Sequence, residues 1–190
     1  MTNFEFVFSL LVILLGLALA EVLGGLARTV KRRPRIRIGW GTCLLATWVM
    51  TETVIFWEII WRTRNVIPND SPALFGGFAI TALYYFAAAV VWPDDIERLA
   101  PPDEYFMAEK GKAIGAILAA VALSFVLRAA AMGLASWQAI PWYAWGSLAV
   151  IYVAGPLAAL TKRRDVAIAC LALLVLVDLL DPIETIIWPG

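Results

Sequence analysis

Six long apolar stretches, separated by short polar segments, run along the chain. Each is close to the roughly 20 residues that an α-helix needs to cross the hydrocarbon core of a bilayer. The pattern therefore predicts an all-α integral membrane protein, a six-transmembrane-helix bundle that forms one domain over residues 1–190. The expected spans run from about Phe6 to Ala27, Ile38 to Trp61, Ala73 to Trp92, Ala113 to Ala135, Trp142 to Thr161 and Val166 to Asp181.

Prolines and charges mark the breaks between these stretches. A basic run surrounds Pro34, and the pair Pro102-Asp103 predicts that the fourth helix begins at Asp103, before its apolar stretch enters the membrane. Pro182 is expected to end the sixth helix, because proline lacks the backbone N–H that a helix interior requires. Trp40 and Trp92 are expected at the inner membrane interface, where tryptophan is enriched.

The positive charges predict an orientation. Twelve of the fifteen Lys and Arg residues fall in the first, third and fifth connecting segments. The positive-inside rule then places those segments in the cytoplasm and both termini on the outer, periplasmic side. We expect a multi-pass protein of the bacterial inner membrane.

Opposite orientation of the two halves is compatible with a weak 3+3 inverted repeat, an arrangement common among secondary transporters. The sequence shows only a short echo between the halves. Trp40-Gly41-Thr42 in the second stretch matches Trp145-Gly146-Ser147 in the fifth.

Composition agrees with a membrane location and narrows the chemistry. Hydrophobic residues make up 62% of the chain and charged residues 16%, which is too apolar for a soluble domain of this size. The chain has no histidine, which excludes His-ligated haem, His-rich zinc sites and Ser-His-Asp catalysis. Glycine-rich phosphate loops and Gly-x-Ser-x-Gly elbows are also missing from the sequence. We therefore expect no enzymatic activity, no cofactor, no metal site and no nucleic-acid partner.

Four ionisable residues lie deep within the spans, where an ionised side chain costs about 2.5–3.5 kcal/mol on insertion scales. They are Glu52, Arg128, Asp178 and Asp181. Residue counting places them at similar depth, so we expect them to converge in the bundle interior, in the outer half of the membrane. All four ionised would sum to a charge of −2, so one acid should be protonated or a cation should bind. The alternative is a structural lock in which Arg128 pairs with one aspartate.

Other polar residues are candidates for lining a pathway, or for donating only to neighbouring backbone. These are Thr51, Thr53, Thr81, Tyr84, Tyr85 and Ser124.

Two further features concern packing and lipid. Gly16, Ala20 and Gly24 repeat every four residues, a small-residue stripe expected to allow close helix contact, within the chain more often than between chains. Arg32, Arg33 and Arg35 are expected to determine topology and to attract anionic lipid headgroups.

The leading hypothesis is a small channel or secondary transporter for protons or a small cation that uses the buried acids and Arg128. The alternative is a non-catalytic accessory or assembly subunit of a larger membrane complex, in which the charge cluster forms structural ion pairs. Besides the lipid bilayer, a homo-oligomer or a larger complex is the expected partner.

Overall fold

The computed structural model describes residues 3–31, 39–64, 70–95, 103–133 and 142–187, without the side chains of 3–7, 132, 142–144 and 181–187. Within these ranges the chain forms helices and no strand. The prediction of an all-helical chain is therefore confirmed for this part of the protein. The helices are α1 (Asn3–Lys31), α2 (Trp40–Arg62), α3 (Ser71–Val91), α4 (Glu104–Met132), α5 (Trp142–Leu160) and α6 (Arg164–Ile187).

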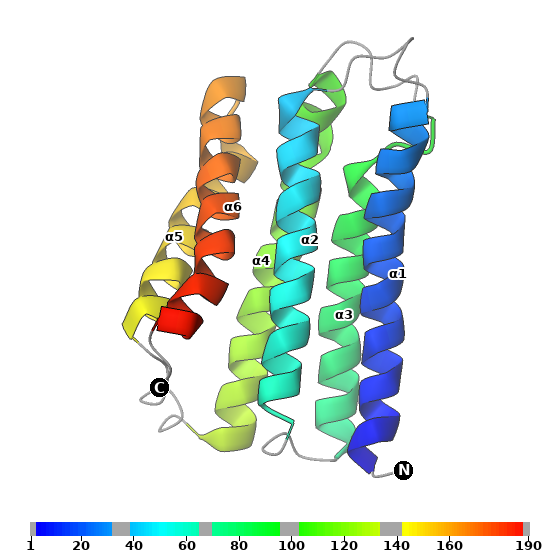
Figure 1. The fold of residues 1–190 in the computed structure, drawn as a ribbon, viewed down its shortest axis with the longest axis vertical. Coiled ribbons are helices and arrows are strands. Elements are labelled where there is room, and N and C mark those ends of the chain that lie inside the picture. Colours follow the sequence, from blue (N-terminus) through cyan, green and yellow to red (C-terminus); the bar gives the residue numbers. More distant parts are fainter. Residues whose placement is uncertain (1–2, 32–38, 65–69, 96–102, 134–141, 188–190) are drawn as a thin grey trace.

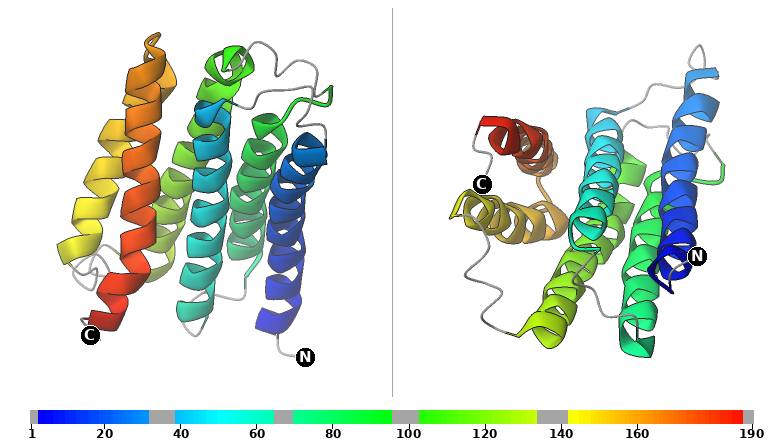
Figure 2. Two further views of the ribbon diagram at one scale, coloured as in Figure 1. Left: turned by 45° about the horizontal axis from the view of Figure 1, so that its top comes forward. Right: turned by 60° about the horizontal axis from the view of Figure 1, so that its bottom comes forward.

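Helices that follow each other in the chain run in opposite directions, so α1 begins and α6 ends at the same end of the bundle (Figure 1). The six helices form two layers. One layer contains α6, α2 and α1, and the other contains α5, α4 and α3 (Figure 2). The central helices α2 and α4 therefore have neighbours on both sides and provide much of the bundle interior.

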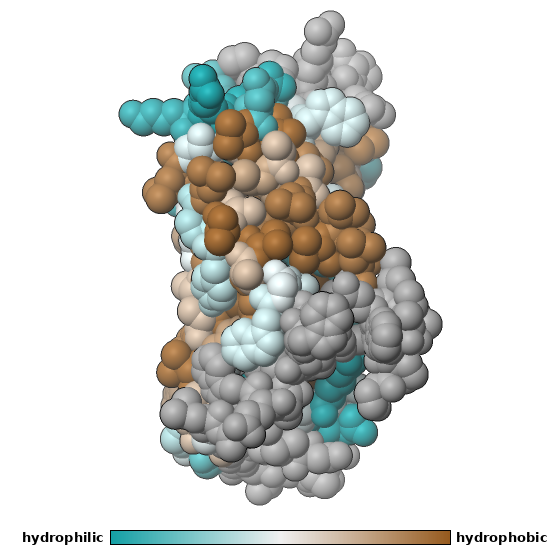
Figure 3. All heavy atoms as spheres, turned by 90° about the vertical axis from the view of Figure 1, so that its left-hand side faces the viewer, coloured by the Kyte–Doolittle hydropathy of each residue, from teal (hydrophilic) through white to brown (hydrophobic). Residues whose placement is uncertain are grey.

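The surface has the character of a membrane protein. Helices α1 to α4 are long and apolar enough to cross a bilayer, and α5 contains a shorter apolar stretch, Trp145–Leu160. Large apolar side chains such as Ile13, Val153 and Leu160 face outward. On the α5–α6 side, an apolar band lies across the middle of the molecule, and hydrophilic residues gather at the end near the α5–α6 turn (Figure 3). A bilayer supplies the apolar surroundings that such a band requires.

The start of α4 and the end of α6 can be compared with the helix ends predicted from the sequence. Helix α4 begins at Glu104, immediately after Asp103, close to its predicted start. Helix α6 continues past Pro182 to Ile187, so the prediction that this proline ends the helix is wrong. An internal proline removes one amide donor and hinders the carbonyl four residues earlier, but the helix can continue beyond it.

Helix α1 packs through a different face from the one the small residues suggested. Leu11, Leu15 and Val22 are buried, whereas Gly16 and Ala20 are exposed. A Cβ atom placed on Gly16 would meet no atom within 4 Å, and one on Gly24 would meet only Arg28. The expected intrachain contact along Gly16, Ala20 and Gly24 is therefore not the one the structure contains. The reason is that α1 buries its large apolar side chains against α3.

Trp92, predicted to lie at the inner membrane interface, is at the C-terminal end of α3. Its side chain is buried, and its ring lies against Gly25 of α1, where an added Cβ would be 2.2 Å from the ring. Trp40, in contrast, is 74% exposed. Gly25 is therefore the small residue of α1 that allows a close contact within the bundle.

Candidate functional site

Two acids lie deep in the bundle, one on α2 and one on α6, and these two helices pack against each other. Glu52 lies near the middle of α2 and Asp178 in the second half of α6, and each is only 4% exposed. Tyr84 of α3, 1% exposed, contacts Glu52 and lies within electrostatic range of Asp178, and Tyr152 of α5 lies within electrostatic range of Glu52. We call Thr51, Glu52, Tyr84, Tyr152 and Asp178 the core acid cluster.

Hydroxyl groups contact both carboxyl groups of the core acid cluster. The Tyr84 side chain is hydrogen-bonded to Glu52. Thr51 Oγ1 lies 2.7 Å from Asp178 Oδ2 and 3.0 Å from the carbonyl oxygen of Trp48 in its own helix. The cluster therefore links α2 to α3 through one acid and α2 to α6 through the other.

Aromatic packing determines where the Tyr84 hydroxyl lies. The Tyr84 ring stacks on Phe56, with ring centroids 5.0 Å apart and an interplanar angle of 25°. Phe56 follows Glu52 by four residues, so both lie on the same face of α2. The helix that supplies the acid therefore also supplies the ring that holds its hydrogen-bonding partner.

Prolines modify the backbone beside the core acid cluster. Pro156 follows Tyr152 by four residues within α5, and Pro182 follows Asp178 by four residues within α6. Because proline has no N–H, neither the Tyr152 nor the Asp178 carbonyl oxygen can receive the usual helical hydrogen bond. Polar backbone inside a membrane protein is tolerated where it lies within protein or lines a cavity. These two carbonyl oxygens add acceptors beside the acids.

Arg128 does not join the acids in the described part of the chain. It lies one turn from the end of α4, and no described carboxylate is within ion-pair distance of it. Its Nε atom is buried and has no hydrogen-bond partner there. The expected convergence of Arg128 with Glu52 and Asp178 is therefore not found. Counting residues along a span ignores how far each helix is shifted along the bundle axis.

The remaining predicted site residues divide into two groups. Thr53, Thr81 and Ser124 donate to carbonyl groups of their own helices, and Tyr85 is 40% exposed. They stabilise local backbone or face outward. Four other predicted site residues are not covered. Arg32, Arg33 and Arg35 lie outside the described residues, and the side chain of Asp181 is not described.

A third buried acid, Asp103, which the sequence did not reveal as a site, lies near the first residues of α2 and α6. Asp103 Oδ1 accepts the backbone N–H of Gly41 at 3.1 Å, and Oδ2 lies 2.6 Å from the Arg164 guanidinium. Gly39 leaves room for this carboxylate, because an added Cβ would be 1.6 Å from Oδ1. Asp103 therefore connects α4 to the first turn of α2 and to the first residue of α6.

Lys110 is the other buried charged residue in this region, 2% exposed. Its ammonium group donates to the carbonyl oxygens of Ala158, Ala159 and Thr161, the last two at 2.8 and 2.9 Å. Carbonyl groups at a helix C-terminus have no intrahelical donors, and the helix dipole favours a cation there. Lys110 thus caps α5. A lysine one helical turn before an apolar span was the only sequence signal.

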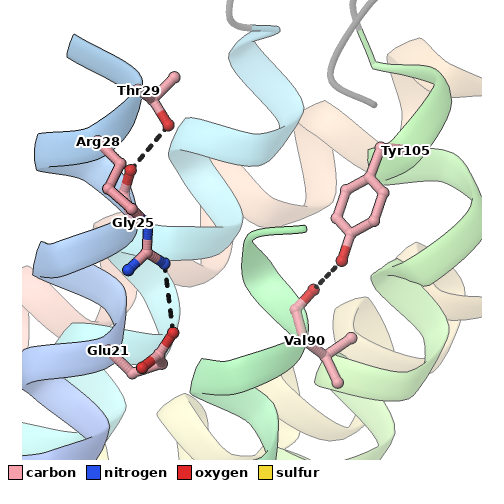
Figure 4. Close-up of polar contacts among 6 residues, drawn as sticks. All are labelled: Glu21, Gly25, Arg28, Thr29, Val90 and Tyr105. Atoms are coloured by element: carbon pink, nitrogen blue, oxygen red, sulfur yellow. Dashed lines mark hydrogen bonds and ion pairs between the residues drawn. The ribbon is translucent and has the colours of Figure 1, made fainter. Parts of the chain in front are cut away.

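Two further polar contacts lie at this end of the bundle (Figure 4). The Tyr105 hydroxyl donates to the Val90 carbonyl at 2.9 Å and joins α4 to α3. Arg28 lies 3.4 Å from Glu21, so the two form an exposed ion pair on α1. At the opposite end, Glu58 and Arg62, four residues apart on α2, form an ion pair. These exposed pairs contribute little stability.

Among the described residues, no group of three or more His, Cys, Asp or Glu side chains is placed to hold a metal ion. Comparisons with protein-family models, curated proteins and solved structures give no match for this chain.

Proposed function

We propose that this protein is a small membrane channel or secondary transporter for protons or a small cation, and that Glu52 and Asp178 bind the ion. One observation carries the proposal. Two carboxyl groups from different helices are buried in an apolar bundle, and each has a hydroxyl partner from another helix, Tyr84 for Glu52 and Thr51 for Asp178. Ionisable residues inside a membrane are costly and mark ion pathways and proton relays.

The surroundings of the acids support this function. Thr51 and Tyr84 supply hydroxyl groups. Pro156 and Pro182 leave the backbone carbonyl oxygens of Tyr152 and Asp178 without their usual helical donors. Hydroxyl groups can pass on protons, and both hydroxyl and carbonyl oxygen atoms can coordinate small cations. Arg128 is omitted from the proposed site, because none of the ion pairs among the described residues joins it to either acid.

The proposed setting is the bacterial inner membrane, crossed six times with both termini outside. The ends of α1 and α5 and the start of α6 meet at the same end of the bundle (Figure 1). Exposed basic residues gather there, and the positive-inside rule favours the cytoplasm for that end. They include Arg28, Lys31, Lys112, Lys162, Arg163 and Arg164. A 3+3 inverted repeat remains part of the proposal.

A second candidate is the accessory subunit of a larger membrane complex. Two observations favour it. Thr51 and Tyr84 already contact the acids within the chain, as they would in purely structural links between helices. Gly16 and Ala20 also present an exposed small-residue stripe, a surface typical of close helix contacts in membranes.

The test is an ion-flux assay in proteoliposomes that contain the purified full-length protein. Proton flux is followed with a trapped pH-sensitive dye, and sodium or potassium flux with matching ion gradients. We expect wild-type flux that is abolished by Glu52→Gln and by Asp178→Asn. Glu58→Gln is the matched control, because Glu58 lies on the same helix but is exposed and paired with Arg62.

Two results would count against transport. Absence of flux for all three ions in the wild-type protein, together with a partner that stays bound in mild detergent, would favour the accessory role. Equal loss of flux in Glu58→Gln would show that the assay reports protein quality instead of the core acid cluster.

A further inference from the structure

The Thr51 hydroxyl makes two close contacts to oxygen atoms but has one proton to donate. Thr51 Oγ1 is 2.7 Å from Asp178 Oδ2 and 3.0 Å from the Trp48 carbonyl oxygen. Both separations are within the range of an O–H···O hydrogen bond. A hydroxyl group has only one proton to donate, and a carbonyl oxygen can only accept. The other contact therefore needs a proton from Asp178 if both are complete hydrogen bonds.

Other hydroxyl groups in the chain show where the Thr51 proton points. Each is on a helix and donates to a carbonyl group three or four residues earlier, as Thr51 does toward Trp48. They are Thr29 (2.7 Å), Thr47 (2.9 Å), Thr53 (2.6 Å), Thr63 (2.7 Å) and Ser124 (2.7 Å). The same arrangement at Thr51 leaves its oxygen lone pairs facing Asp178.

The charge of the interior favours the same assignment. Glu52 and Asp178 both lie close enough to Tyr84 to influence it electrostatically, and neither is exposed to solvent. Two ionised carboxylates close together in an apolar interior repel each other and lose their hydration, so such pairs tend to share one proton. The hydrogen bond from Tyr84 suits an ionised Glu52, which can only accept.

We propose that Asp178 is a neutral carboxylic acid that donates its proton to Thr51, and that the ion handled by the core acid cluster is the proton. This inference rests on the proposed transport function for its biological meaning, but the protonation state can be measured independently. Glu52 is then the ionised member of the pair, and Asp178 is the residue that binds and releases the transported proton.

Infrared spectroscopy of the protein in lipid at neutral pH tests the assignment. We expect the C=O stretching band of a protonated carboxylic acid in the wild-type spectrum, and its loss in Asp178→Asn. Asparagine keeps a side-chain donor for Thr51. Asp165→Asn is the matched control, because Asp165 lies on the same helix but is exposed, and the acid band should persist in it.

Thr51→Val provides a second measurement that does not depend on the folding of Asp178→Asn. We expect the acid band to remain but to shift in frequency, because its hydrogen-bond acceptor is removed. Loss of only carboxylate bands in Asp178→Asn, or an unshifted acid band in Thr51→Val, would overturn the proposal.

The two proposals can fail separately. Proton flux without an Asp178 acid band would leave the transport function standing and reject the assignment of the proton to Asp178. Sodium or potassium flux without proton flux would reject the proton as the ion while retaining transport. An acid band without any flux would reject transport and leave Asp178 as a neutral structural residue.

Discussion

Asp103 Oδ2 lies 2.6 Å from the guanidinium of Arg164, and the same carboxylate accepts the Gly41 amide through Oδ1. Asp103 precedes α4, Arg164 begins α6, and Gly41 lies in the first turn of α2. One buried side chain therefore connects the starts of the two helices that carry Glu52 and Asp178. Contacts at this end contribute to how the two acids are placed relative to each other in the bundle interior.

Replacing Asp103 should destabilise the bundle. We expect Asp103→Ala to lower the free energy of unfolding by about 2 kcal/mol, because the Gly41 amide loses its acceptor and alanine is strained at the left-handed φ of 66°. Asp103→Asn should lose less, since asparagine keeps an acceptor and tolerates this conformation. Thermal unfolding in detergent, followed by tryptophan fluorescence, measures both, with Asp165→Ala as control. Equal losses for Asn and Ala would show that the ion pair with Arg164 is the dominant contribution.

Lys110 should be important for stability although it lies at the charged end of the protein. Lys110→Met keeps most of the side-chain volume but leaves the carbonyl groups at the end of α5 without their donor. We expect a loss of about 1–3 kcal/mol in the free energy of unfolding. Lys112→Met is the matched control, because Lys112 is exposed and forms an ion pair with Glu109. Its effect should stay within about 0.5 kcal/mol. Similar effects for the two variants would contradict the capping role.

Glycines of α1 should differ sharply in their tolerance of a methyl group. Gly25→Ala places a Cβ against the Trp92 ring and should destabilise the protein by about 1–3 kcal/mol, as overpacking does. Gly16→Ala should be neutral or stabilising by up to about 1 kcal/mol, since nothing lies within 4 Å and alanine favours the helix. Thermal unfolding of the two variants checks this. A large loss of stability for Gly16→Ala, accompanied by a change of mass in native mass spectrometry, would instead identify the stripe as a contact between chains.

The Tyr84 hydroxyl should affect both stability and transport. Tyr84→Phe keeps the stack on Phe56 but removes the hydrogen bond to Glu52, which should reduce the free energy of unfolding by about 1–3 kcal/mol. On the proposed function, it should also remove most of the proton flux in proteoliposomes. Tyr85→Phe is the adjacent control, with a half-exposed side chain, and should retain both properties. Unchanged flux in Tyr84→Phe would exclude this hydroxyl from the pathway.

Double-mutant cycles should distinguish the contact partner of Asp178. The Thr51 and Asp178 pair should show a coupling energy of about 0.5–3 kcal/mol, because the two side chains are hydrogen-bonded. Arg128 and Asp178 should couple by less than about 0.5 kcal/mol, the value typical of separated sites. Unfolding of the four variants in each cycle gives the two energies. A large coupling energy between Arg128 and Asp178 would support the alternative from the sequence, in which Arg128 forms a structural ion pair with an aspartate.

Much of the architecture follows from the sequence because a bilayer simplifies the problem. Apolar stretches of membrane-crossing length must satisfy their backbone internally, so they are helical, and four of the described helices are long and apolar enough to cross a bilayer. The burial of Glu52 and Asp178 follows from the same physics, because lipid penalises exposed charge. These conclusions need only the composition and length of each segment.

Relations between helices were decided by tertiary packing. On α1, the face with Gly16 and the face with Gly25 were both plausible contact surfaces. Packing against α3 and Trp92 places Gly25, and not the Gly16 stripe, inside the bundle. Arg128 was placed with the acids by counting residues, but it lies one turn from the end of α4, and no described carboxylate is within ion-pair distance of it. Asp103 and Gly41 are 62 residues apart, and no local pattern links them. A sequence determines what each segment requires from its surroundings, whereas the shifts and rotations of the helices determine which partner supplies it.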